Sequence, residues 1–165
     1  MTTPSVTLNQ TYDFQLHMDN FKCDELSEEE VIEMYKDGRV FSQWVERWLT
    51  KKFPLIRVNG CKKYDHTDLN DENIKYEQKT FTPASGLSYA PSGQTGVGRT
   101  LNETVAKERA SDLIYIIVSN IHFPNIKVKF ITGKDLMKKE IEIMKRKNEK
   151  IKCKISLKHH DTFFT

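Results

Sequence analysis

Hydrophobic residues along this chain change their spacing several times, and each spacing predicts one element. Apolar residues alternate with polar ones over Tyr12–Met18, which is the period of a half-buried strand, either at a sheet edge or in a dimer contact. A capping box formed by Ser27 and Glu30 opens a short helix. Apolar residues then recur at helical spacing from Val40 to about Lys52, and Pro54 follows the end of that second helix.

The middle of the chain predicts a pair of strands. Tyr64–Leu69 and Ile74–Phe81 have strand character, and the polar residues between them, 70–73, supply the turn. Leu113–Val118 is a continuous apolar run rich in β-branched residues, as expected for a strand buried on both faces. The other predicted elements are a helix at Leu101–Ala110, a strand at Ile126–Ile131, a helix from Leu136 to about Asn148 and a strand at Ile151–Leu157.

These elements predict an α/β (α+β) fold, with a central mixed β-sheet of four or more strands flanked by helices. A length of 165 residues is typical of a single domain. Hydrophobic residues make up 38% of the chain and charged residues 30%. The net charge of +3 permits a nucleic-acid partner without requiring one.

The spacing of the cysteines and the hydropathy of the chain indicate the cellular compartment of the protein. Cys23, Cys61 and Cys153 are widely spaced and form no CxxC pair, which favours free thiols in a reducing compartment over a structural zinc site. The N-terminus does not have the pattern of a signal peptide, and nowhere are 18 apolar residues consecutive. We therefore expect an intracellular, cytoplasmic protein with no membrane partner.

Candidate chemistry is concentrated on the predicted strand pair. Glu77 and Lys79 are two residues apart, so the pleat of a strand directs both side chains to one face of the sheet. The preceding strand carries Asp65 and Asp68, and pairing of the two strands brings one of these aspartates beside Glu77. Two carboxylates held together repel each other unless a cation lies between them, and Mg²⁺ is the cation that oxygen ligands favour. The pattern therefore predicts a metal site suited to the hydrolysis of phosphate esters.

Asp68 followed after eight residues by Glu77-Gln78-Lys79 resembles the D…(D/E)xK signature of the restriction-endonuclease-like, or PD-(D/E)xK, nuclease superfamily. The predicted order of elements agrees with that family: a helix, a strand pair around the motif, then a helix and another strand pair. The resemblance implies that the acidic pair binds one or two Mg²⁺ ions, helped by the main-chain carbonyl of Gln78. It also implies that Lys79 positions or activates the attacking water. The competing interpretation is a solvated hairpin with ordinary surface charges.

The aspartate beside Glu77 is either Asp65 or Asp68, and Glu46 is a further candidate for this site. Asp65 and Asp68 both fall within the spacing of the family, and Asp68 is preferred because an apolar residue follows it, as expected for a core strand position. Glu46 lies on the predicted helix before the strand pair, where the family often carries a glutamate that reaches toward the metal. An exposed Glu46 paired with a Lys or Arg one turn further along the helix is the alternative. His66 could act as a general base, although we expect ordinary surface hydrogen bonding.

The polar segment Thr80–Thr100 directly follows the predicted catalytic strand, so we expect it to lie along DNA or else to form a flexible surface loop. Gln94 and Arg99 are candidates for contacts with bases or phosphates, and Lys107 and Arg109 for contacts with phosphates. Residues 93–100 nearly match a nucleotide-binding P-loop. The loop lysine is replaced by Arg99 and no apolar strand precedes the segment, so no nucleotide cofactor is expected.

The resemblance implies a Mg²⁺-dependent DNA endonuclease, with a type II restriction enzyme that cuts double-stranded DNA as a homodimer as the first choice. A DNA-repair or junction-resolving nuclease of the same fold, or a non-catalytic nucleic-acid-binding module, is the alternative. We expect one nuclease domain over 1–165: an N-terminal strand and helix extension at 1–38, a catalytic core at 39–135, and a C-terminal helix and strand at 136–165.

At the C-terminus, His159-His160-Asp161 suggests a metal site, but adjacent ligands on an extended chain point to opposite faces. His122, in the turn before the strand at Ile126–Ile131, is expected to be inert.

Overall fold

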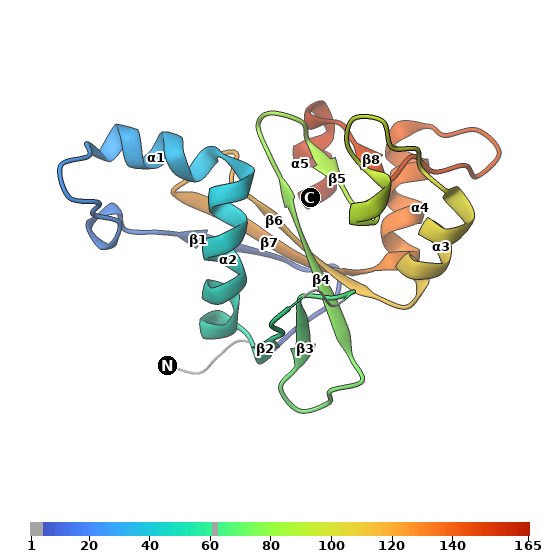
Figure 1. Ribbon diagram of the computed structural model, residues 1–165, viewed down its shortest axis with the longest axis horizontal. Coiled ribbons are helices and arrows are strands. Elements are labelled where there is room, and N and C mark those ends of the chain that lie inside the picture. Colours follow the sequence, from blue (N-terminus) through green and yellow to red (C-terminus); the bar gives the residue numbers. More distant parts are fainter. Residues whose placement is uncertain (1–4, 61–62) are drawn as a thin grey trace.

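The computed structural model describes residues 5–60 and 63–165, and its centre is a six-stranded mixed sheet in the order β1-β7-β6-β4-β3-β2 (Figure 1). The pairing of β4 with β6 is parallel, and the other pairs in this sheet are antiparallel. The strands of this sheet are β1 at Thr11–Gln15, β2 at Leu55–Arg57, β3 at His66–Asp68, β4 at Lys75–Phe81, β6 at Ile114–Ser119 and β7 at Asn125–Thr132.

Helices cover both faces of the sheet: α1 and α2 lie on one side, and α3, α4 and α5 lie on the other (Figure 1). A small second sheet of two strands, β5 and β8, lies on the side of α3 and α4. The helices are α1 at Glu28–Lys36, α2 at Gly38–Lys52, α3 at Glu103–Ser111, α4 at Gly133–Met144 and α5 at His160–Phe164, with β5 at Leu87–Ser88, β8 at Lys154–Ile155 and short 3₁₀ turns at Met18–Asn20, Ser92–Gln94 and Leu157–His159. The predicted fold class, a mixed sheet flanked by helices, is confirmed.

Two hydrophobic cores lie on opposite faces of the sheet and fix which side chains of β4 face which helices. Tyr76 is 2% exposed and belongs to the core beneath α2, whereas Phe81 is fully buried in the core beneath α3 and α4. Because side chains alternate along a strand, Glu77 and Lys79 share the face of Phe81. Glu77 and Lys79 therefore face α3, not α2.

Strand β4 is paired unequally on its two sides. Its ladder with β3 ends at the pair His66 and Tyr76, while its ladder with β6 continues as far as Phe81 and Ser119. We call the backbone of β4 beyond Tyr76, on the side that faces β3, the β3-side edge. This edge lies near the middle of the molecule, where β2 and β3 diverge from the rest of the sheet (Figure 1).

The N-terminal strand is at a sheet edge, one of the two placements predicted for it, since β1 pairs antiparallel with β7. Of the cysteines, Cys23 and Cys153 are free, and Cys61 lies outside the described residues. Among the residues that the structure describes, no helix combines the length and the apolar character needed to cross a membrane.

The predicted strand at Ile151–Leu157 is wrong in extent. Only Lys154–Ile155 is a strand, and the chain then forms a 3₁₀ turn and helix α5. Cys153 has a φ of 55° in the left-handed region, which interrupts an extended chain. The last long helix also ends earlier than predicted, at Met144, because Lys145 takes a left-handed conformation with a φ of 53°.

The segment Thr80–Thr100 is not a flexible surface loop over its whole length. Leu87 and Tyr89 are buried, and β5 pairs with β8 so that the first half of the segment is part of the α3-side core. Tyr89 also donates a hydrogen bond to the buried carboxylate of Glu140, 2.5 Å away. Exposed residues occur at Ala84 and Ser85 and then over most of 91–100, next to α3.

Candidate active site

Glu77 and Lys79 form the centre of a charged cluster on the α3 face of β4. Lys79 Nζ lies 3.6 Å from Glu77 Oε1, and Arg109 on α3 places its guanidinium nitrogen 3.5 Å from Glu77 Oε2. The Glu77 side chain is only 13% exposed, so these ion pairs are partly shielded from water. Arg109 also donates a hydrogen bond to the carbonyl of Lys63, which ties α3 to the segment leading into β3.

Asp65 joins this cluster at the β3-side edge. Its Oδ2 accepts a hydrogen bond of 2.8 Å from the main-chain nitrogen of Gln78, the residue between Glu77 and Lys79. Burial raises the pKa of Glu77, and the nearby charge of Asp65 raises it further, while Lys79 and Arg109 act to lower it. The pKa is therefore raised despite two neighbouring cations, which means that they do not offset the burial of Glu77 and the charge of Asp65 together.

The carbonyl of Gln78 is directed toward the same side as its N–H, because both main-chain groups of a strand residue point to one neighbour. The predicted help of this carbonyl in binding Mg²⁺ is thus consistent with its position beside Asp65. The Gln78 side chain points to the other face, where its amide donates to Thr80 Oγ1 at 2.9 Å. Its amide group is therefore not part of the cluster.

Glu46 approaches the cluster from α2. Its Oε2 lies 3.4 Å from Arg57 Nε on β2, and its side chain is only 21% exposed, so the alternative of an exposed acid paired one turn along its own helix is wrong. The pKa of Glu46 is nevertheless raised, first by burial and then by the charge of Asp65, which places the two acids near each other. The Nε2 of the buried His66 donates to the main-chain carbonyl of Glu46 at 2.8 Å and so fixes α2 against β3.

The expected surface role of His66 is therefore wrong. The ring is fully buried, and burial lowers its pKa, which favours the neutral imidazole. Because a carbonyl can only accept, the Nε2 of His66 carries the proton. Its role is to hold Glu46 in place, and this role could not be foreseen without the position of α2.

Asp68 is separated from Glu77 by the sheet. Its Oδ1 accepts from the main-chain nitrogen of Asn70 at 2.9 Å, and its Oδ2 accepts from the hydroxyl of Tyr76 at 3.4 Å. Tyr76 lies in the core beneath α2, and burial, followed by the charge of Asp68, raises its pKa to about 12. The preference for Asp68 over Asp65 as the acid beside Glu77 is accordingly corrected.

The reason for this correction is the length of the turn. A four-residue turn, with Leu69 opposite Ile74, would place Asp68 on the face of Glu77. In the structure Thr67 pairs with Lys75, and the main-chain nitrogen of Asp68 donates to the carbonyl of Ile74 at 3.0 Å. Five residues, 69–73, therefore form the turn, and Leu69 is 56% exposed. A shift of one residue in register moves every side chain of β3 to the other face. Asp65 consequently shares the face of Glu77.

The four residues proposed to contact DNA have different surroundings. Arg109 belongs to the cluster around Glu77. Lys107 is paired with Glu103 at 3.0 Å, and Arg99 donates to the carbonyl of Ser92 at 3.0 Å. Gln94 accepts from the main-chain nitrogen of Asn102 at 2.7 Å. Arg99 and Gln94 thus fold the segment 91–100 on itself next to α3.

A groove of about 750 Å³ adjoins the cluster and shares Arg109 with it. Lys63, Tyr64 and Lys75 line one part of it, and Gln94 and Arg109 line the other. Lys75 Nζ lies 5.0 Å from the centre of the Tyr64 ring, a cation–π contact. Glu108 and Asp112 also line the groove, so it combines three cations and two acids with an aromatic ring beside Glu77.

Asp65, Glu77, Lys79 and Arg109 are brought together, and Glu46 lies at the margin of this group. Among the described residues, three potential ligand atoms come within 4.8 Å of one another only in another group, formed by His122, His160 and Asp161. Glu46 does not complete a comparably tight triad with Asp65 and Glu77. Sequence reasoning missed Arg57 and the contact of His66 with Glu46, because in both cases the partner lies on a different element.

Searches against protein-family models, curated proteins and solved structures find no match.

Proposed function

We propose that this chain is a Mg²⁺-dependent deoxyribonuclease with Asp65, Glu77 and Lys79 at its active centre. The observation that carries the proposal is that these three residues converge at the β3-side edge of β4, with Asp65 bonded to the main chain between the other two. The order of elements is also the one on which the family resemblance rests. Helix α2 precedes the strands β3 and β4, and α3, β6 and β7 follow.

The residues present suit a magnesium ion. Asp65, Glu77 and the carbonyl of Gln78 offer hard oxygen donors, which Mg²⁺ prefers, and one or two carboxylates are the usual protein share of such a site. The raised pKa of Glu77 agrees with this proposal, because a divalent cation would stabilise the ionised carboxylates that burial disfavours. Asp65 and Glu77 would hold the ion, and Glu46 is available to a second one.

When bound, Mg²⁺ would polarise the scissile phosphate, lower the pKa of a coordinated water and neutralise the leaving oxygen. Lys79 lies beside Glu77 and is assigned to orient the attacking water or to stabilise charge on the phosphate. Arg109 is assigned a contact with the phosphate as well as with Glu77. Glu46, which Arg57 and His66 hold in place, would add its negative charge to that of Asp65.

DNA is the proposed substrate because the adjoining groove carries Lys63, Lys75 and Arg109 around Tyr64, which outnumber its two acids, Glu108 and Asp112. Cations match phosphates, and the exposed face of an aromatic ring can stack on a base. Within the nuclease class, a restriction endonuclease acting on double-stranded DNA as a homodimer is the first proposal, and a repair or junction-resolving nuclease is the second. Digestion of plasmid DNA with Mg²⁺ to discrete bands supports the first proposal. Cleavage of branched DNA alone supports the second.

The replacement of Lys79 by Ala separates catalysis from metal binding. We expect Mg²⁺-dependent cleavage to fall by about 100-fold or more, because a group that stabilises developing charge is lost. Mn²⁺ binding measured by calorimetry should stay within about threefold of the wild-type affinity, since both carboxylates remain. Lys154→Ala, which removes an exposed lysine from β8, is the matched control and should cut DNA at the wild-type rate.

Undiminished cleavage by Lys79→Ala would remove the lysine from the proposed mechanism. A wild-type protein that binds DNA, but shows neither cleavage nor any heat of Mn²⁺ binding, would favour the non-catalytic nucleic-acid-binding module instead.

A further inference from the structure

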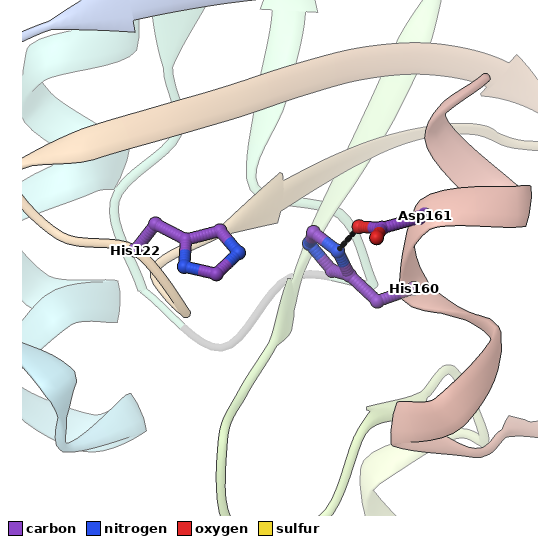
Figure 2. A group of neighbouring side chains, drawn as sticks. All are labelled: His122, His160 and Asp161. Carbon is purple, nitrogen blue, oxygen red and sulfur yellow. Dashed lines mark hydrogen bonds and ion pairs between the residues drawn. The ribbon is translucent and has the colours of Figure 1, made fainter.

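A second group of potential metal ligands lies away from the charged cluster, at the turn between β6 and β7. His122 comes from this turn, and His160 and Asp161 come from the first turn of α5 (Figure 2). One ligand atom from each residue lies within 4.8 Å of the other two. The expectation that His160 and Asp161 would point to opposite faces is wrong, because this segment is helical and not extended.

The ring of His160 is held in one orientation. Its Nε2 lies 2.7 Å from Ser119 Oγ, and its Nδ1 lies 2.8 Å from Asp161 Oδ1. The rings of Phe81 and Phe164 pack against it at centroid distances of 5.1 and 4.9 Å. A histidine whose one nitrogen is hydrogen-bonded to a fixed partner has its tautomer and direction set for metal binding through the other nitrogen. Ser119 can play this part for His160.

The other two members are free to adjust. His122 is exposed and its ring lies 5.9 Å from that of His160, at an interplanar angle of 84°. The side chain of Asp161 is 92% exposed. Ligands of one tetrahedral Zn²⁺ lie about 3.4 Å apart, given bonds of about 2.0 to 2.1 Å. Rotation of these two side chains closes the remaining gap, and the ion would replace the hydrogen bond between His160 and Asp161.

Space and charge around the group are compatible with an ion. A hollow of about 270 Å³ adjoins the group and is lined by His122 and by Ser119, the hydrogen-bond partner of His160, so it offers room for a water to complete the coordination. Lys127 also lines this hollow, but its Nζ lies 2.6 Å from Asp13 Oδ1, which offsets its positive charge.

We infer that His122, His160 and Asp161 form a binding site for a divalent transition-metal ion, with Zn²⁺ as the best match. Two imidazoles and one carboxylate suit zinc, and three protein ligands with one open position are a recognised zinc arrangement. The ion would join the β6–β7 turn to α5 and so anchor the C-terminus. The site is separate from the proposed Mg²⁺ site, whose donors are all oxygens, and does not depend on nuclease activity.

The test is a titration of the full chain with Zn²⁺, by competition with a chromophoric chelator in the presence of excess Mg²⁺. One ion should bind with a dissociation constant near micromolar or tighter, on the order of −8 kcal/mol. His122→Ala should weaken binding at least about tenfold, because a ligand is lost and its exposed position spares the fold. Asp161→Asn should weaken it in the same direction, and Co²⁺ should give a visible spectrum that both variants lose.

Two controls distinguish this site from other histidines and from the Mg²⁺ site. His17→Ala and Glu77→Gln should both retain wild-type Zn²⁺ affinity. Zn²⁺ should also raise the melting temperature of the wild-type protein and leave that of His122→Ala unchanged. A wild-type dissociation constant weaker than about 100 µM, or equal Zn²⁺ affinity for wild type and His122→Ala, would overturn the inference.

Discussion

Replacement of Asp65 by Asn is expected to reduce Mg²⁺-dependent DNA cleavage by about 100-fold or more, because a metal ligand supplies several kcal/mol of transition-state stabilisation. The amide oxygen can still accept the hydrogen bond from the main chain of Gln78, so the local fold is retained. Single-turnover cleavage of a labelled DNA at fixed Mg²⁺ measures the loss. The melting temperature reports on folding.

Asp68→Asn is the matched variant, because it makes the same chemical change three residues further along the chain. Its oxygen can still accept from the main chain of Asn70, and its side chain lies on the α2 face with Tyr76. We expect its cleavage rate to stay within about threefold of wild type. The reverse ranking of the two variants would return the ligand role to Asp68 and contradict the register described here.

The largest expected effect on stability comes from Gly133→Ala. A β-carbon at this position would lie 1.7 Å from the main-chain oxygen of Ala110 and 2.5 Å from its carbonyl carbon. The main-chain nitrogen of Gly133 also donates to the carbonyl of Leu113 at 2.9 Å, so neither segment can move away freely. We expect the free energy of unfolding to fall by about 3 kcal/mol or more, measured by urea denaturation.

Gly93→Ala is the control, since a β-carbon there meets no atom within 4 Å. Its free energy of unfolding should change by no more than about 0.5 kcal/mol. Because α3 ends next to Ala110, any rearrangement around Gly133 is also expected to displace Arg109 from Glu77. A Gly133→Ala protein as stable as the control would show that α3 and the start of α4 are not in close contact.

The strongest periodic segments were predictable from sequence. Phe41, Val45 and Leu49 repeat at helical spacing and are all fully buried on α2. The run that forms β6 is buried along nearly its whole length, as its continuous apolar character predicted. In both cases the pattern alone specifies the element, because burial on one or both faces is what produces the pattern.

The C-terminal segment shows where the same reasoning fails. Ile151, Cys153 and Ile155 alternate with lysines and are all buried, yet only two residues there form a strand. Burial of alternate residues requires only that the chain lie on the core, and the left-handed conformation of Cys153 interrupts the strand. The pairing of His122 with α5 depends on this helical ending and was therefore also missed.

The candidate site was predictable in part. Glu77 and Lys79 follow from their two-residue spacing on a strand, and both do face one side of the sheet. The choice between Asp65 and Asp68 depended on whether Leu69 belongs to the strand or to the turn, and composition does not decide that. The position of Arg109 against Glu77 requires the packing of α3 on the sheet, which lies beyond any local pattern.

The central claim is that Asp65, Glu77 and Lys79 act on one divalent cation to cut DNA. Its most direct test compares wild type with Glu77→Gln on supercoiled plasmid DNA, with Mg²⁺ and with excess chelator. We expect wild type to convert the plasmid only with Mg²⁺, and Glu77→Gln to bind the DNA without cutting it. Equal cleavage by Glu77→Gln, or cleavage by wild type that persists in chelator, would contradict it.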